Sequence, residues 1–230
     1  MLTLEKLRIE QGDFCLTADW SVPEGSITAI VGPSGGGKST LFSVIGGYFS
    51  ATSGRILWKA TVIGALPPGK RPVSTLFQDN NLFPHLTVAQ NVGLALRPDL
   101  RLTGAEKVQV EAALAEVGLA GYGARKPGTL SGGQASRAAL ARVLLQSRPI
   151  ILLDEPFSAL GPALRREMLG LVAEKLGERT VLIVTHDPSD AREIAQRLVM
   201  VDAGVASAPV PITEAFERPS PALAGYLGQK

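Results

Sequence analysis

A short glycine-rich segment has the residue types and spacing of a phosphate-binding loop, G-x-x-x-x-G-K-[ST]. It consists of Gly32, Pro33, Ser34, Gly35, Gly36, Gly37, Lys38, Ser39 and Thr40. Glycine lets the backbone curl until several N–H groups point at one anion, and the helix start that follows adds partial positive charge. Lys38 can then reach the β- and γ-phosphates, and the Ser39 hydroxyl can bind Mg²⁺. The loop therefore predicts a nucleoside triphosphate site, and a plain glycine turn is the alternative.

Two adjacent carboxylates, Asp154 and Glu155, follow the apolar run Ile150–Leu153. Such a run is typical of a buried parallel strand, and ligands bind beyond the carboxyl ends of such strands. Asp154 suits the Mg²⁺ shell of a bound nucleotide, whereas Glu155 can orient and deprotonate an attacking water. By itself the pair is equally compatible with a surface turn, and the phosphate loop upstream favours the site.

A third segment, Leu130 followed by Ser131, Gly132, Gly133 and Gln134, stands before an alanine-rich stretch with helical periodicity. A hydroxyl and glycine N–H groups at a helix start form a second anion site. Ser131 is also a natural N-cap, so a purely structural role is the alternative. The chain thus carries two phosphate-binding elements for one kind of nucleotide.

With these three segments the chain resembles the ATPase subunits of ABC transporters, in which two subunits enclose two ATP molecules. The resemblance extends over nearly the whole length. It implies that Gln78, after the apolar run that ends at Phe77, contacts Mg²⁺ and the attacking water. It implies that His186 contacts the γ-phosphate, that Glu155 is the general base, and that residues 131–134 close over the ATP of a second copy.

The expected site therefore has four parts. The catalytic residues are Glu155, His186 and Gln78; the ATP-binding residues are those from Gly32 to Thr40; the residues that bind ATP across the dimer are Ser131, Gly132, Gly133 and Gln134; the metal ligands are Ser39, Gln78 and Asp154. The expected cofactors are ATP and Mg²⁺.

Three positions depart from the pattern of that family. Gly161 stands where the family has an aspartate along the dimer interface, which puts the coupling of the two ATP sites in doubt. An aromatic ring normally stacks on adenine, but Gln11 stands near that place, and Phe14, the nearest aromatic, is equally suited to a core strand. The stretch after the glycine-rich motif is less basic than usual, and we expect Arg137 to be a structural or interface residue.

The order of apolar stretches and turn signals predicts an α/β fold. Strands are expected at Leu2–Ile9, Phe14–Val22, Ser26–Val31, Arg55–Trp58, Ala60–Ile63, Pro72–Phe77, Ile150–Leu153, Thr180–Val184 and Leu198–Val201, and helices at Ser39–Gly46, Thr87–Leu96, Ala105–Val117 and Ser131–Gln146. The resemblance makes this a P-loop NTPase of the ABC type, with a RecA-like core, an antiparallel β subdomain and a helical subdomain. We expect one domain over 1–230, with the core at 1–85 and 148–205, the helical subdomain at about 86–147 and a short tail at 206–230.

Composition narrows the class of protein. Hydrophobic residues make up 45% and charged residues 19% of the chain, and the net charge is +2. This balance excludes a disordered chain and gives no basic stripe for nucleic acid. Apolar runs stay shorter than the roughly 18 residues that cross a bilayer. The N-terminus lacks the pattern of a signal peptide, and the single Cys15 suits the cytosol. We expect a soluble intracellular protein that reaches the membrane through a partner.

The stretch from Arg71 to Asn91, RPVSTLFQDNNLFPHLTVAQN, closely resembles the ATPase subunits of bacterial thiamine importers. This resemblance implies a homodimer on the cytoplasmic face of the bacterial inner membrane, an integral-membrane permease and an external solute-binding protein. Residues 79–85 would face the permease, with Leu82 and Phe83 in a docking groove; a core loop is the alternative. Thiamine or its phosphates are the expected solutes, and iron, polyamines and other small solutes stay open.

Two other functions compete with transport. A soluble ABC ATPase of translation or DNA repair commonly carries two cassettes or a long coiled-coil insertion, and this chain shows neither. A phosphate-loop kinase has no use for the segment from Leu130 to Gln134. Copurification with a membrane protein separates the first from a transporter, and transfer of phosphate to an acceptor other than water identifies the second.

Overall fold

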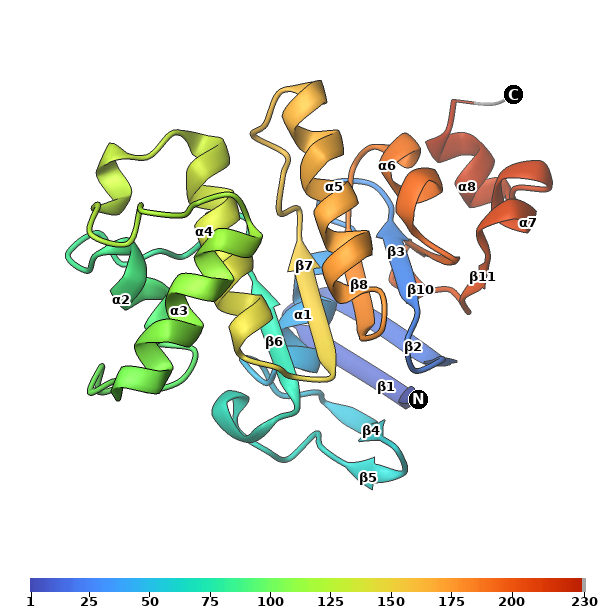
Figure 1. Cartoon of the computed structure of the whole chain (residues 1–230). Coiled ribbons are helices and arrows are strands. Elements are labelled where there is room, and N and C mark those ends of the chain that lie inside the picture. The colour runs from blue at the N-terminus through green and yellow to red at the C-terminus, as the bar shows by residue number, and fades with distance from the viewer. Residues whose placement is uncertain (229–230) are drawn as a thin grey trace.

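A mixed β-sheet runs through the computed structural model, which describes residues 1–228 (Figure 1). These residues form an 11-stranded sheet in the order β5-β4-β1-β2-β10-β9-β3-β8-β7-β6, with β11 beside β9. The strands are β1 (Leu2–Gln11), β2 (Phe14–Val22), β3 (Ile27–Val31), β4 (Ser53–Trp58), β5 (Thr61–Val62), β6 (Val73–Leu76), β7 (Ile150–Asp154), β8 (Thr180–Val184), β9 (Arg197–Asp202), β10 (Val205–Ala206) and β11 (Val210–Pro211). The helices are α1 (Lys38–Gly46), α2 (Val88–Gly93), α3 (Gly104–Glu116), α4 (Gly132–Leu145), α5 (Pro162–Leu176), α6 (Pro188–Ile194), α7 (Ile212–Glu217) and α8 (Pro221–Tyr226).

The sheet has a parallel part and an antiparallel part. Strands β6, β7, β8, β3 and β9 are parallel, whereas β1 pairs antiparallel with both β2 and β4, and β4 with β5. The register places Leu76 beside Leu153, and Val184 beside both Asp154 and Ile30. The loops after β6, β7, β8 and β3 therefore leave the sheet at one edge, which is where a ligand of parallel strands binds.

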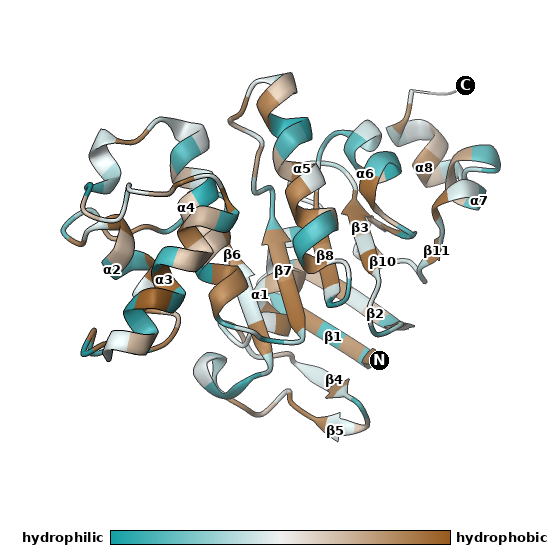
Figure 2. Ribbon diagram, viewed as in Figure 1, coloured by the Kyte–Doolittle hydropathy of each residue, from teal (hydrophilic) through white to brown (hydrophobic). Residues whose placement is uncertain are grey.

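The parallel strands are buried on both faces, which explains their continuous apolar runs (Figure 2). In β7, Ile150 and Leu152 belong to the core shared with α1 and the antiparallel strands. Ile151 and Leu153 belong to the core on the opposite face. Helix α1 is therefore enclosed between the two parts of the curled sheet, and the phosphate loop at its start rests on a rigid base.

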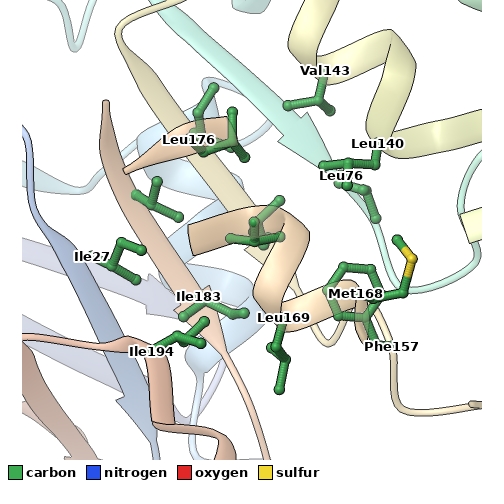
Figure 3. Packing of buried hydrophobic residues seen from close by; sticks show 14 of the residues in the cluster. Ile27, Leu76, Leu140, Val143, Phe157, Met168, Leu169, Leu176, Ile183 and Ile194 are labelled. Carbon is green, nitrogen blue, oxygen red and sulfur yellow. The ribbon is translucent and has the colours of Figure 1, made fainter. Parts of the chain in front are cut away.

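The core on the other face joins three regions of the chain (Figure 3). Met168 and Leu169 of α5 pack there with Ile183 of β8, and Leu140 of α4 packs beside Leu76 of β6. Helix α4 also contacts α2, α3 and α5. The helices between residues 86 and 147 are thus connected to the sheet mainly through α4.

Several elements go beyond the sequence expectation. Helix α5 was not predicted, although its buried residues Met168, Leu169, Val172 and Leu176 have helical spacing. The short tail expected at 206–230 contains β11, α7 and α8. Strand β5 is shorter than predicted because the two residues before it, Lys59 and Ala60, have left-handed backbone and form the turn.

None of the helices in residues 1–228 combines the length and the apolar character that a bilayer-spanning segment needs.

A buried arginine closes the far end of α1. Arg71 is 3% exposed, and its guanidinium donates to the carbonyls of Val44 and Ile45, at 2.6 and 2.8 Å, and to those of Gly64 and Leu66. Cations are favourable near the last carbonyls of a helix, which carry partial negative charge. Burial lowers the pKa of Arg71. This side chain therefore connects α1 to the loop that precedes β6.

We expect Arg71→Met to lower the free energy of unfolding by about 2–4 kcal/mol, because buried carbonyls lose a charged donor. Urea unfolding followed by tryptophan fluorescence measures the change. Arg148→Met is the matched control, since Arg148 is only half-buried and makes one solvent-exposed 3.2 Å bond to the Gly69 carbonyl; its effect should stay within about 0.5 kcal/mol. Equal effects of the two substitutions would contradict a structural role for Arg71.

Candidate functional site

The phosphate loop joins β3 to α1, and two glycines determine its path. A Cβ at Gly32 would lie 2.0 Å from the carbonyl oxygen of Val201, and Gly37 has a φ of +100°. A Cβ at Gly37 would also lie 2.5 Å from the Phe14 ring. Only glycine fits both positions, because the neighbouring backbone and ring leave no room for a side chain. Pro33, Ser34 and Gly35 form the exposed crest of the loop, Gly36 is half-buried, and Thr40 lies half-buried in α1.

Phe14 therefore lies beside the phosphate loop. It pairs with Gln11 across the β1–β2 hairpin and packs, partly buried, against the core beneath the antiparallel strands. Gln11 is exposed. This placement agrees with a strand residue that supports Gly37.

Lys38 lies inside the loop and is 4% exposed. Its ammonium donates to the carbonyls of Gly32 and Pro33, each at 2.9 Å. Burial lowers the pKa of Lys38, and the nearby carboxylates of Glu155 and Asp154 act in the opposite direction. A buried ammonium that contacts only neutral carbonyls and lies near two acids is well placed to pair with a phosphate oxygen.

Asp154 and Ser39 provide two oxygen ligands next to that loop. The Ser39 hydroxyl donates to Asp154 Oδ1 at 3.2 Å, and Asp154 is 9% exposed. Burial raises the pKa of Asp154, the Ser39 hydrogen bond opposes this, and the charge of Glu155 adds to it. A divalent cation would offset the cost of the buried charge. Hydroxyl and carboxylate oxygens fit Mg²⁺, which takes its other ligands from water and phosphate.

Glu155 and His186 are in direct contact, Oε1 to Nε2, although they follow different strands. Glu155 has a left-handed backbone, with φ +47°, and its N–H donates to the Val184 carbonyl at 3.2 Å. This conformation is costly for a residue with a Cβ and is held by its surroundings. The Glu155 side chain is 11% exposed and that of His186 43%. The Glu155 carboxylate thus lies at the edge of the site, next to the His186 imidazole. In this position it can act as a general base that accepts a proton from water.

Gln78 lies two residues beyond β6, at the same sheet edge, and is exposed. Within residues 1–228 its side chain makes no hydrogen bond. The loop that follows is shaped by two buried side chains that the sequence analysis missed. Arg142 of α4 donates to the carbonyls of Asn80 and Asn81, and Asn91 of α2 bonds the backbone of residue 83 in both directions. The available signal was Arg142 itself, a charged residue within the apolar C-terminal half of α4.

The second glycine-rich motif forms the start of α4. The Ser131 Oγ accepts from the Gln134 N–H at 3.3 Å, and the Gln134 side chain accepts from the Ser131 N–H at 3.0 Å, which is a capping box. Ser131 and Gly132 are exposed, whereas Gly133 is buried against Leu164 of α5. The Ser131 hydroxyl accepts in the cap and keeps its own proton for an anion. No hydrogen bond in the described chain joins this motif to the phosphate loop.

Arg137 has the structural role expected for it. It donates to the Val117 carbonyl at 2.9 Å and forms an ion pair with Glu167, so it connects α4 to the C-terminal end of α3 and to α5.

A buried ion pair behind Glu155 and His186 was also missed. Arg165 of α5 donates to Asp190 of α6 at 2.7 Å, and the Thr185 hydroxyl donates to the same carboxylate oxygen at 2.9 Å. These residues line a cavity of about 370 Å³ together with Glu155 and His186. The Arg165–Asp190 pair could not be identified from the sequence, because α5, which carries Arg165, was not predicted. Gly161 caps α5 without a side-chain bond, and a Cβ there would meet no atom within 4 Å.

Comparisons with known proteins agree with this geometry. Three relatives are called thiamine import ATP-binding protein ThiQ. The protein of Cereibacter sphaeroides is 56% identical and that of Ruegeria sp. 52%, each over 99% of this chain and 100% of the relative. That of Mesorhizobium japonicum is 48% identical over 98% of this chain and 90% of its own length.

Two solved structures share the fold. A dimeric structure of the ATP-binding cassette MJ0796 bound to ADP and phosphate superposes with a TM-score of 0.80 at 29% identity, over 92% of this chain and 99% of that one. A second dimeric structure of MJ0796, described as a bacterial ABC transporter cassette, gives 0.80 at 30% identity over the same shares. The predicted fold class is therefore confirmed. The family model described as ABC transporter matches residues 16–158, from β2 to the turn after Glu155, and the chain belongs to the ABC transporter family as an ATP-binding cassette.

Proposed function

We propose that this protein is the ATP-hydrolysing subunit of a bacterial importer of thiamine or thiamine phosphates. It acts as a homodimer on the cytoplasmic face of the inner membrane, with an integral-membrane permease and an external solute-binding protein. The observation that carries the proposal is the 56% identity, over essentially both full lengths, to a thiamine import ATP-binding protein. The site supports the ATPase part independently, through the buried Lys38 and the Asp154–Ser39 pair.

The residues of one subunit bind and orient ATP. The amides of the phosphate loop and the start of α1 surround the phosphates, and Lys38 exchanges its carbonyl partners for β- and γ-phosphate oxygens. Ser39, Asp154 and Gln78 would hold Mg²⁺, which supplies positive charge to the phosphates when it is bound. Ser39 and Asp154 are already held together by a hydrogen bond at the sheet edge, so this pair needs little reorganisation when ATP binds.

Glu155 and His186 act on the attacking water and the γ-phosphate. The Glu155 carboxylate accepts the proton of the water, while the imidazole of His186 holds the carboxylate and contacts the γ-phosphate. The contact between the two side chains supports this division, because it directs both toward the same point beyond β7 and β8.

The motif at the start of α4 acts on the ATP of the second subunit. Its exposed Ser131 and Gly132 and the free N–H groups of the helix start form an anion site. The motif bonds to its own helical region and not to its own phosphate loop, which supports a role across a dimer interface. The solved cassettes that this chain resembles are dimers. ATP binding would then close the dimer, and hydrolysis would open it.

A groove near residue 78, with both polar and aromatic side chains in its lining, supports docking of the permease. It has a volume of about 260 Å³ and is lined in part by Tyr48, Phe77 and Phe83. Tyr48 and Phe83 are 49% and 42% exposed, so the groove presents aromatic surface. Leu82 points to the core instead. A helical loop of a permease could insert there, and the loop after Gln78 would transmit its movement to the ATP site.

Glu155→Gln is expected to lower ATP hydrolysis by about 10²–10⁴-fold, because the amide cannot accept the proton of the water. ATP binding should persist, and a dimer should accumulate with ATP during size-exclusion chromatography with light scattering. Glu178→Gln is the control, since Glu178 is exposed and lies beyond the far end of α5. Hydrolysis by Glu155→Gln at the normal rate would exclude Glu155 as the base.

Ser131→Arg is expected to abolish hydrolysis and to leave ATP binding by the monomer unchanged, because the bulky side chain blocks only the ATP of the partner. Filter binding and phosphate release measure the two properties. Thr103→Arg removes a capping box of the same type from α3 and should leave hydrolysis normal. Loss of ATP binding by the Ser131→Arg monomer would contradict a role across the interface.

Labelled thiamine uptake tests the solute. Cells that lack their own thiamine importer receive the permease, the solute-binding protein and either this chain or its Glu155→Gln variant. We expect uptake only with the unmodified chain, since transport needs hydrolysis. Equal uptake in both strains would reject thiamine as the solute while leaving the ATPase assignment intact, and labelled iron and polyamines serve as comparison solutes.

A further inference from the structure

The last described helix, α8, is fixed against the core beside the nucleotide site (Figure 1). Its first turn has a proline at N1, and the Ser220 Oγ accepts from the Leu223 N–H at 3.3 Å. Leu223 is 2% exposed and belongs to the same core as Leu198 and Met200 of β9. The end of α8 is therefore held in place by packing, although it comes from a part of the chain that no nucleotide-binding motif covers.

Tyr226 lies at this end, and its hydroxyl donates to the backbone carbonyl of His186 at 2.8 Å. Burial raises the pKa of Tyr226 and the charge of Asp187 raises it further, whereas a hydrogen bond from the Gly32 backbone acts in the opposite direction. The charge of Glu155 also raises this pKa. The hydroxyl consequently stays protonated at neutral pH and remains a donor.

The hydroxyl occupies the place where strands β3 and β8 separate. The last bond between these strands joins the Thr185 N–H to the Ile30 carbonyl at 3.3 Å. Beyond it, one strand enters the phosphate loop at Gly32 and the other enters the turn at His186. The Tyr226 hydroxyl donates to the backbone of the second segment, at the His186 carbonyl, and lies near the backbone of the first, at Gly32.

We propose that Tyr226 is a positioning residue for ATP hydrolysis, which holds the backbone turn of His186 against the end of α8. It acts through His186 and does not touch ATP. The His186 side chain is 43% exposed, so its direction depends largely on how its backbone is held. Without the hydroxyl, the imidazole would spend less time against Glu155. The inference rests on the proposed ATPase function of this site.

Tyr226→Phe tests the hydroxyl, because the ring and its packing remain. We expect kcat for ATP hydrolysis by the purified protein to fall about fivefold, the effect of one net hydrogen bond, with KM for ATP unchanged within about twofold. The melting temperature should change little. An unchanged kcat would overturn the proposal.

Ser220→Ala is the matched control, since it removes the cap of the same helix and keeps the hydroxyl. It should lower the melting temperature more than Tyr226→Phe and leave kcat near that of the unmodified protein. If Ser220→Ala reduces kcat as much as Tyr226→Phe does, the effect comes from the stability of α8, and a specific role of the hydroxyl is rejected.

The histidine signals provide a readout that does not require hydrolysis. The chain has two histidines, and His85 lies in the exposed loop after Gln78, so two-dimensional NMR of the rings separates them once His85→Ala assigns the pair. In the nucleotide-free protein, Tyr226→Phe should shift the His186 signal and leave that of His85 unmoved. An unchanged His186 signal would contradict the positioning role of Tyr226. If the unmodified protein does not hydrolyse ATP but Tyr226→Phe still shifts the His186 signal, the proposed function is contradicted and the positioning role is not.

Discussion

The register of the parallel strands is the constraint on which this site depends. Backbone hydrogen bonds align the ends of β3, β8, β7 and β6, so that four loops leave the sheet at one edge. Each loop contributes one kind of group: the amides and ammonium of the phosphate loop, the carboxylates after β7, the imidazole after β8 and the amide after β6. A shift of any strand by one residue would turn its functional side chain to the wrong face. Burial of both faces of the sheet opposes such a shift.

Charge burial at this edge prepares the site for its ligand. Lys38 and Asp154 are almost completely buried. Burial lowers the pKa of Lys38 and raises the pKa of Asp154, so it favours the neutral form of each group. Their partners within the chain are neutral carbonyls and one hydroxyl. A polyphosphate with its divalent cation would bring charges of the opposite sign to both, so its binding would relieve a cost that folding created. The left-handed backbone of Glu155 is a further cost at the same place.

Elements far from the sheet edge also hold the turn of His186. The Arg165–Asp190 pair joins α5 and α6 behind it, and α8 reaches it through Tyr226. Helix α5 starts at Gly161, where a dimer partner is expected to lie, and its Leu164 packs on the glycine-rich motif of α4. The space beside Gly161 is open, so the missing aspartate would fit without a clash. Gly161 has φ −64° and ψ 158°, an extended backbone that any residue can adopt, so the path of the chain does not require glycine there.

The sequence by itself determined the parts that depend on local spacing. The phosphate loop, the carboxylate pair after an apolar strand and the capping box at Ser131 are each encoded within a few neighbouring residues, and the periodicity of 2 or 3.6 predicted most strands and four helices. The boundaries shifted by a few residues where turns such as that at Lys59 intervene. Helix α5 escaped prediction although its periodicity was present.

Only the tertiary structure decided which distant groups meet. Glu155 contacts His186, Arg165 contacts Asp190 and Tyr226 contacts His186 because separate strands and helices bring them together, at sequence separations as large as 40 residues. No local pattern encodes such pairs, since they depend on strand order and on where the last helix packs. The sequence thus determines which functional groups the chain carries, whereas the fold determines the distances between them that catalysis requires.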